Sequence, residues 1–341
     1  MHFEPVKVAI IGCGAITEKQ YLPAIDSTTS IQVVAHFDPL EERASTVGRL
    51  CKYSQRVPSA SAAAKLGADA VIIAAPANFH AQHSVEAMAA GLHVLCEKPI
   101  ASTIAEAEVM LDTAIRTCKI LSVGLCRRHY PTTKAVRQLI QEGMLGSPQR
   151  YIICEGGQFR WPVSSASFFD PEQSAGGVLH DLGSHTLDLI LHWFGDPVQV
   201  DYFDDAKGGL ETNCLIRFQH QSGLKGEVRL SRDWTTSNRY YIEFERGWVS
   251  FHPGQADQLQ MGSQSGEIAF SVNLCEQSSY WNLPDCGPKA MTALQSFSYQ
   301  LDQFVKAIRG QDNQCVLGLE AIRSLQLIET CYAERRELVM T

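Results

Sequence analysis

The sequence predicts an α/β protein with an N-terminal doubly wound parallel sheet and a C-terminal α+β domain built on a large, mostly antiparallel open sheet. Over the first 125 residues, short continuous apolar runs alternate with helical patterns, as is typical of strands buried on both faces. Between about residues 198 and 270, short runs of alternating polarity are separated by turn signals, which indicates antiparallel strands. A chain of 341 residues exceeds the usual size of one hydrophobic core, so we expect two domains, 1–125 and 126–341.

The first domain is predicted as strands and helices in regular alternation. The strands are expected at residues 6–11, 31–37, 70–75, 92–96 and 120–124. The helices are expected at residues 17–28, 39–50, 81–90 and 103–118. Pro39 stands near the first turn of the second helix, and Gly91 ends the third. Short connections between such elements predict a parallel sheet covered on both sides.

The second domain is predicted to begin with a helix at 131–142, a strand at 151–159 and a helix at 176–195. Further strands are expected at 213–219, 225–231, 240–245 and 248–252, joined by turns at Ser222-Gly223 and Arg246-Gly247. Helices return at 292–309 and 318–335, and these C-terminal helices can pack back on the first domain. No linker-like segment separates the two domains.

Composition narrows the classes of partner. The 29 basic and 37 acidic residues give a net charge of −8, which argues against nucleic acid or an anionic membrane. No apolar run reaches the length of a membrane span. The eleven cysteines are scattered, without a C-x-x-C pair, and several lie in apolar runs, where free cysteine packs as a small hydrophobe. Since the N-terminus also lacks the pattern of a secretory leader, we expect a cytoplasmic protein.

A glycine motif follows the first predicted strand. Gly12-Cys13-Gly14 lies between a buried strand and a helix, which is the context that dinucleotide binding requires. Gly12 would permit a tight turn, and Gly14 would let the backbone approach a pyrophosphate at the helix N-terminus. Thr17 stands where glycine or alanine is usual, so we expect it to crowd the helix–strand contact. A glycine turn without a ligand is the alternative.

Asp38 ends the second predicted strand. A carboxylate there can accept both ribose hydroxyls of an adenosine and would repel a 2′-phosphate. Pro39, rather than arginine or serine, comes next, so NAD is favoured, while Arg43 keeps NADP as the alternative. A helix cap is the other interpretation of Asp38.

Lys98 follows the predicted strand 92–96, within Glu97-Lys98-Pro99. In a doubly wound sheet the carboxyl ends of the strands line the ligand crevice, so Lys98 should face the cofactor. A lysine there can donate to a substrate hydroxyl and stabilise alkoxide character. A surface lysine paired with an acid is the alternative.

Residues 176–188, G-G-V-L-H-D-L-G-S-H-T-L-D, place Asp181, His185 and Asp188 on one face of a helix. A carboxylate beside an imidazole handles protons, because it orients the ring and stabilises its charged form. Together with the glycine motif, this pair predicts hydride chemistry. Asp181 as a helix cap beside a core histidine is one alternative. A metal site using Asp181, His185 and His180 is another, but we expect no metal.

Five motifs occur in order along essentially the whole chain: Gly12-Cys13-Gly14-Ala15-Ile16, Ala75-Pro76-Ala77-Asn78-Phe79-His80, residues 91–99 ending in Glu97-Lys98-Pro99, the D-x-G-x-H-x-x-D motif of residues 181–188, and the tail from Phe304 to Ala333. With these motifs the chain resembles the Gfo/Idh/MocA oxidoreductases, which include glucose–fructose oxidoreductase and inositol dehydrogenase. The resemblance implies a Rossmann domain that binds NAD(P), and a second domain whose exposed sheet face commonly forms the interface of a homodimer or homotetramer.

The residues and the resemblance together define the expected site. Cofactor contacts are expected from Gly12, Gly14, Ala15, Ile16, Asp38, Ala75, Pro76, Asn78, His80, Glu97 and Lys98. The resemblance implies that the nicotinamide lies between Lys98 and the Asp181–His185 pair. It also implies that His185 is the proton acceptor, that Lys98 contacts the reacting hydroxyl, and that Asp181 assists His185 or binds substrate. The Lys98–Pro99 peptide is often cis in such relatives.

Some residues depart from the family pattern. Cys126 and His129-Tyr130 replace an asparagine and a phenylalanine–aspartate pair that are common in relatives, so the specificity is expected to be unusual. Besides Asp181 and His185, substrate contacts are expected from Arg128, Phe159, Arg160 and Trp161, because aromatic faces and guanidinium groups suit sugar rings. A solvent-exposed arginine and a core aromatic cluster are the alternative.

We therefore expect a catalytic dehydrogenase for a small polyhydroxylated substrate: a sugar, a cyclitol or a related polyol. His185 would take the hydroxyl proton, Lys98 would stabilise the oxyanion and Asp181 would hold the His185 tautomer. A histidine with a pKa of about 6.5 suits a base that works at neutral pH. The alternatives are an NAD-dependent glycosidase or epimerase without net redox change, a non-catalytic nucleotide-binding regulator, and a reductase of C=C or C=N bonds.

Overall fold

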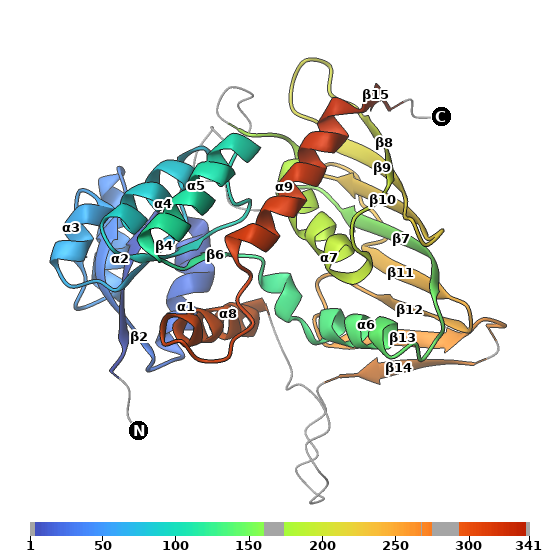
Figure 1. Ribbon diagram of the computed structural model, residues 1–341, viewed down its shortest axis with the longest axis horizontal. Helices are drawn as coiled ribbons and strands as arrows, with labels where there is room; N and C mark the ends of the chain where they lie inside the picture. Colours follow the sequence, from blue (N-terminus) through green and yellow to red (C-terminus); the bar gives the residue numbers. More distant parts are fainter. Residues whose placement is uncertain (1–3, 160–173, 267, 275–292, 339–341) are drawn as a thin grey trace, which may run out of the picture. The chain divides into compact units, whose positions relative to one another are not determined.

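The computed structural model describes residues 4–159, 174–266, 268–274 and 293–338 (Figure 1). Its internal contacts divide the chain into two compact units. The first takes in Met1–Leu125 and Phe297–Gln326, as far as these ranges are described. The second takes in the described parts of Cys126–Trp161, Gly176–Ser296 and Leu327–Thr341.

The first unit contains a six-stranded sheet in the order β3-β2-β1-β4-β5-β6. Its strands are β1 Val6–Ile11, β2 Ile31–Phe37, β3 Gln55–Arg56, β4 Ala70–Ile73, β5 His93–Cys96 and β6 Leu121–Val123. All neighbouring strands are parallel, so the predicted doubly wound sheet is confirmed. The strand order reverses between β1 and β4, which is where such sheets bind their ligands.

Helices follow the strands in the four regions where they are expected, and a further helix at Ala60–Lys65 was not predicted. They are η1 Thr17–Tyr21, α1 Leu22–Asp26, α2 Glu41–Leu50, α3 Ala60–Lys65, η2 Ala77–Phe79, α4 His80–Ala89 and α5 Ile104–Thr117. The element η1 is a π-helical turn, which periodicity alone does not distinguish from α-helix. Thr103 and Glu106 form a capping box that begins α5.

Two C-terminal helices complete the cores. They are α8 Ala293–Ile308 and α9 Gly318–Ala333. Ile322 and Leu325, early in α9, belong to the core of the first unit, whereas Leu327 and Ile328 belong to the core of the second. The segment before α9 also extends the first unit, because the Val123 N–H donates to the Val316 carbonyl at 2.9 Å.

The second unit contains a nine-stranded sheet in the order β14-β13-β12-β11-β7-β10-β9-β8-β15 (Figure 1). Its strands are β7 Pro148–Gly156, β8 Gln199–Asp204, β9 Asn213–Gln219, β10 Lys225–Ser231, β11 Arg239–Phe244, β12 Gly247–Phe251, β13 Gln258–Ser263, β14 Ala269–Asn273 and β15 Arg335–Glu337. β7 with β10 and β8 with β15 are parallel, and the other neighbours are antiparallel. The predicted mostly antiparallel sheet is confirmed.

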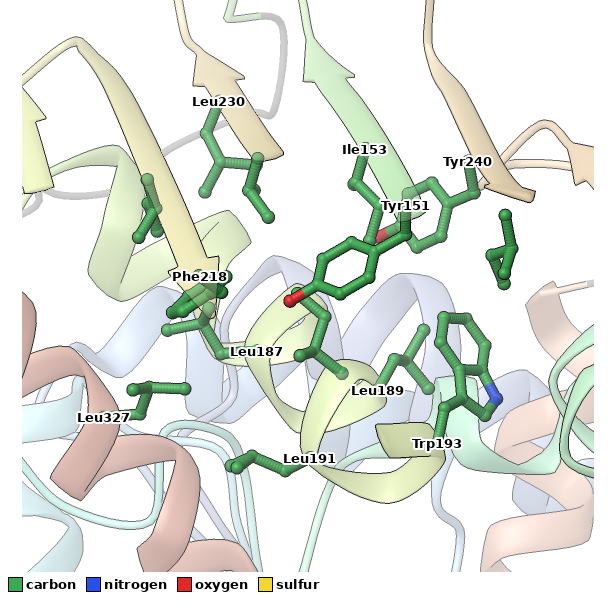
Figure 2. Packing of buried hydrophobic residues seen from close by; sticks show 14 of the residues in the cluster. Tyr151, Ile153, Leu187, Leu189, Leu191, Trp193, Phe218, Leu230, Tyr240 and Leu327 are labelled. Atoms are coloured by element: carbon green, nitrogen blue, oxygen red, sulfur yellow. The ribbon is translucent and has the colours of Figure 1, made fainter. Parts of the chain in front are cut away.

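One face of this sheet packs on the helix that carries the D-x-G-x-H-x-x-D motif. The motif begins in a π-helical turn, η5 Leu179–Gly183, and continues into α7 Ser184–Phe194. Figure 2 shows Leu187, Leu189 and Trp193 of α7 in the same core as Tyr151 and Tyr240 of the sheet. This packing fixes α7 beneath the strands.

The 3₁₀ turn η3 Cys126–His129 and the helix α6 Pro131–Gln141 precede this sheet in the chain. The Trp193 indole N–H donates to the Thr133 carbonyl at 3.1 Å, which ties α7 to α6.

In the described part of the chain, all nine cysteines are free thiols. No helix in those ranges combines the length and apolarity needed to cross a membrane.

Candidate active site

The glycine turn after β1 requires glycine at its first position. Gly12 has a φ of +92°, and its N–H donates to the Phe37 carbonyl at 2.9 Å. A Cβ on Gly12 would lie 2.5 Å from the carbonyl carbon and oxygen of Ala74. Gly14, Ala15 and Ile16 come next. They are partly exposed and lie at the N-terminus of the next helix. This backbone is suited to a pyrophosphate, as the sequence predicts.

Thr17 is accommodated through its hydroxyl rather than by displacing the helix. The side chain is fully buried, and Oγ1 donates to the Gly12 carbonyl at 2.6 Å. The residue that departs from the glycine pattern therefore stabilises the turn, and the expected crowding is replaced by a hydrogen bond.

We expect Thr17→Val to lower the free energy of unfolding by about 1–3 kcal/mol, because the buried Gly12 carbonyl would lose its partner. Thr17→Ser should keep most of the stability. Urea unfolding of the three proteins measures the difference, and equal midpoints for valine and wild type would contradict the role of the hydroxyl.

Asp38 is buried at the end of β2. Its Oδ2 accepts the Cys13 N–H at 2.9 Å, and its Oδ1 accepts the Leu40 N–H at 2.9 Å. Asp38 therefore braces the glycine turn and forms a local turn with Leu40. Each carboxylate oxygen has a second lone pair, so ribose recognition by Asp38 stays a prediction that these contacts allow.

An arginine that the sequence reasoning missed lies beside Asp38. Arg56, at the end of β3, forms an ion pair with Glu41 and donates to the Asp38 carbonyl at 3.4 Å. β3 has only two residues, both exposed, so hydrophobic periodicity offers no signal for it.

The Glu97-Lys98-Pro99 segment follows β5. Glu97 is buried, which raises the pKa of its carboxyl, and it accepts the Tyr21 hydroxyl at 2.6 Å and the Lys98 N–H at 3.1 Å. Lys98 is partly exposed, and the Lys98–Pro99 peptide bond is cis, as the resemblance implies. The Glu97 carboxylate thus supports the segment that presents Lys98.

The loop after β4 carries the other predicted cofactor contacts. Ala75 is partly exposed, and Pro76 and Asn78 are exposed. His80 differs from them, because it is buried and its ring nitrogens face the carbonyl oxygens of Ala75 and Pro99.

In the second unit, two of the three ionisable residues of the motif, Asp181 and Asp188, have separate arginine partners. Asp181 is partly exposed, and its Oδ2 lies 3.3 Å from the Arg232 guanidinium. Asp188 is buried and accepts two hydrogen bonds from Arg128, at 2.8 and 2.7 Å. His185 is partly exposed at the start of α7. The motif begins in the π-helical turn η5, and π-helical turns are frequent at functional sites.

Gly176-Gly177 permits the close approach of two segments distant in the sequence. A Cβ on Gly177 would lie 2.0 Å from the Glu211 carbonyl oxygen, and one on Gly176 would lie 2.3 Å from the Tyr332 hydroxyl. The Glu211 carboxylate accepts the Leu179 N–H at 3.0 Å. The Glu211 carboxylate therefore caps the first N–H of η5, which is the role that was the alternative for Asp181.

Arg232 is the other residue that the sequence reasoning missed here. It is nearly buried, donates to the Gly177 carbonyl at 3.0 Å and lies over the Phe159 ring at 5.7 Å.

The arginine segment after β6 is partly buried in the second unit rather than solvent-exposed. Arg127 forms two hydrogen bonds with Glu155, at 2.8 and 2.7 Å, and Arg128 forms the pair with Asp188. Cys126 and His129 are buried, and burial together with Lys134 and Arg128 lowers the pKa of His129 to about 3. Substrate binding by Arg128 stays a prediction, whereas Arg160 and Trp161 lie outside the described residues.

The described residues at the carboxyl edge of the first sheet fit a dinucleotide. Within the described ranges, no three His, Cys, Asp or Glu side chains form a group that could hold a metal ion. The glycine turn, Asp38 and the loops after β4 and β5 lie at the carboxyl ends of neighbouring strands of one parallel sheet.

Comparison with known proteins supports the same conclusion. Residues 6–125 match the model of an oxidoreductase family with an NAD-binding Rossmann fold (GFO_IDH_MocA), and residues 133–250 match the GFO/IDH/MocA C-terminal domain. D-glucoside 3-dehydrogenase of Escherichia coli (strain K12) is 29% identical over 300 residues, which cover 86% of this chain and 78% of that protein. Rhizopine catabolism protein MocA of Rhizobium meliloti is 27% identical over 331 residues, covering 95% and 93%.

A solved structure shares the fold. The aldose-aldose oxidoreductase from Caulobacter crescentus complexed with glycerol superposes with a TM-score of 0.81 at 22% identity, over 97% of each chain. The two family models span the glycine turn and most of the second sheet, and the chain therefore belongs to the Gfo/Idh/MocA family of oxidoreductases with an NAD-binding Rossmann fold.

Proposed function

We propose that this oxidoreductase transfers hydride between NAD and a secondary hydroxyl of a sugar, cyclitol or related polyol. The observation that carries the proposal is the geometry of η5 and the start of α7. There a partly exposed His185 follows Asp181 by four residues, and Arg232 holds the Asp181 carboxylate. The similarity to a D-glucoside 3-dehydrogenase supports the substrate class.

Each residue has one role in this reaction. His185 removes the hydroxyl proton, because a neutral imidazole is a suitable base near neutral pH. Lys98 donates to the oxygen as it gains negative charge. Asp181 orients His185 and stabilises its charged form. NAD, when bound, would serve as the hydride acceptor.

The direct test is a panel of polyols, sugar acids and nucleotide sugars with NAD⁺ or NADP⁺, followed by absorbance of the reduced cofactor. Reduced cofactor that forms with one substrate class supports the proposal. Product that forms without net reduced cofactor, from protein that retains NAD, would replace it with a glycosidase or epimerase. An absence of both would contradict it.

We propose that NAD is preferred over NADP and that Glu41 contributes beside Asp38. Glu41 neutralises Arg56, which donates to the carbonyl of Asp38 just after β2. Glu41→Gln should therefore raise the ratio of kcat/KM for NADP⁺ to that for NAD⁺ about 2- to 5-fold, the range of an exposed ion pair. Glu42→Gln, the same charge change at the exposed neighbour, is the control. Equal ratios in the two variants would show that Arg56 is not a determinant.

We also propose that the chain forms a homodimer or homotetramer through the outward face of the nine-stranded sheet, which is the face opposite α7. We propose the cytoplasm as its location. Tyr241 and Trp248 stack on this face with ring centroids 6.0 Å apart. Both are partly exposed, while their strand neighbours Tyr240 and Val249 are in the core. The free thiols suit a reducing compartment. Sedimentation of wild type and Trp248→Arg tests the interface, and a monomeric wild type would refute it.

A further inference from the structure

The His80 imidazole joins two loops of the predicted cofactor site. Its side chain is only 1% exposed. Its Nδ1 lies 2.8 Å from the Pro99 carbonyl oxygen, and its Nε2 lies 2.8 Å from the Ala75 carbonyl oxygen. Ala75 follows β4, and Pro99 follows Lys98 directly. One ring thus links the end of β4 to the segment that carries Lys98.

The Ala75 end of this link is itself held in place by the glycine turn. A Cβ on Gly12 would lie 2.6 Å from the Ala75 nitrogen, so the two backbones are in close contact. The glycine turn, the loop after β4 and the Lys98 segment are therefore connected through one buried side chain.

Both carbonyl groups can only accept hydrogen bonds, whereas a neutral imidazole donates one. The charged ring would serve both, but burial lowers the pKa of His80, and His83 and Lys98 lower it further against the two carbonyl contacts. In the neutral ring the two carbonyls compete for one proton. In the Nδ1–H tautomer the ring donates to the Pro99 carbonyl, and Nε2 then contacts the Ala75 carbonyl without donating to it.

We propose that His80 is a positioning residue whose ring holds the Pro99 carbonyl and thereby orients Lys98 relative to the glycine turn. The ring is enclosed and both nitrogens face protein oxygens, so His80 acts through Lys98 and not by touching the cofactor. The effect on turnover rests on the proposed function, in which Lys98 donates to the reacting oxygen. The effect of His80 on the position of the Glu97-Lys98-Pro99 segment does not rest on that function.

Two amide substitutions separate the two links. The amide nitrogen of His80→Asn reproduces Nδ1 and can keep the link to Pro99, and that of His80→Gln reproduces Nε2 and can keep only the link to Ala75. We expect His80→Gln to lower kcat about tenfold, the equivalent of one hydrogen bond of ~1.4 kcal/mol, and His80→Asn to lower it less. A loss in His80→Asn as large as that in His80→Gln would overturn the proposal.

A double-mutant cycle with Lys98→Ala distinguishes positioning from general stabilisation. If His80 acts through Lys98, His80→Gln should cost little further kcat in the Lys98→Ala background. If His80→Gln lowers kcat by the same factor with and without Lys98→Ala, the role of His80 is purely structural and the proposal is refuted.

Hydrogen exchange of the cofactor-free protein provides a readout that needs no turnover. His80→Gln should speed exchange of the backbone amides of residues 97, 98, 100 and 101. His83→Asn, on the same helix with its ring against Phe37 and Phe79, should leave that exchange unchanged. Altered exchange without any polyol oxidation would keep the positioning role and reject the proposed reaction. Unchanged exchange in His80→Gln would reject the positioning role whatever the activity.

Discussion

Replacement of His185 by alanine should lower kcat for the cognate polyol by about 10²- to 10⁴-fold, the usual contribution of a general base. His185 is partly exposed at the start of α7, and the neighbouring Asp181 is held by Arg232. The glycine turn and Asp38 belong to the other unit, so NADH affinity should stay near the wild-type value. Steady-state kinetics and NADH fluorescence titration measure the two quantities.

His192, two turns further along α7, is a matched control. Burial, together with Arg128 and Arg137, lowers the pKa of His192 to about 3, so it is already neutral at working pH. His192→Asn should therefore keep the wild-type pH profile of kcat. Wild-type turnover by a His185→Ala protein that binds NADH normally would eliminate His185 as the base.

Replacement of Arg127 by methionine should lower the free energy of unfolding by about 3–5 kcal/mol, because it would leave a buried carboxylate without its cation. Arg127 donates two hydrogen bonds to Glu155, which also accepts the Tyr240 hydroxyl at 2.8 Å. The side chains of Arg127 and Glu155 are only 16% and 8% exposed, so little water can reach the carboxylate. Chemical unfolding at neutral pH measures the loss.

Two variants test the cause of this loss. Arg127→Met combined with Glu155→Gln should recover much of the stability, since the uncompensated charge is removed. Arg116→Met breaks an exposed pair with Asp112 and should cost less than about 1 kcal/mol. A double variant as unstable as the single one would contradict the electrostatic explanation.

The same pair predicts a pH dependence. Burial raises the pKa of Glu155, but the Arg127 charge and the hydrogen bonds outweigh it and hold this pKa below its usual value. The pair therefore stabilises the fold above the unfolded-state pKa of about 4.3, and the stabilisation is lost as the pH falls toward the folded-state pKa. The stability difference between wild type and Arg127→Met should shrink below that pH, and a difference that stays constant to pH 3 would argue against the pair.

Local patterns were sufficient for most elements of both sheets. Continuous apolar runs predicted β1 and β2 at their observed bounds, and alternating runs did the same for β9 and β10. The two-residue β3 was missed, because an exposed strand of that length has no hydrophobic period. The π-helical turns η1 and η5 were predicted as α-helix, since both helix types bury one stripe of side chains.

The candidate site likewise contains residues that local motifs predict and partners that they do not. Motif spacing predicted Gly12, Lys98, Asp181 and His185 as site residues, because turn geometry and strand ends impose residue types over short distances. It did not locate the partners of these residues. Arg232 reaches Asp181 from a position 51 residues away, and no spacing rule connects them.

By itself, the sequence determined the two kinds of sheet and the glycine turn, which follow from periodicity and local motif. It also predicted the residues to which the proposed chemistry is assigned. Only the tertiary structure decided that Asp188 anchors Arg128, that Glu211 caps the motif helix and that His80 links the loops after β4 and β5. The physical reason is that a buried charge or N–H must find a partner, and the folded chain supplies that partner from segments far apart in sequence.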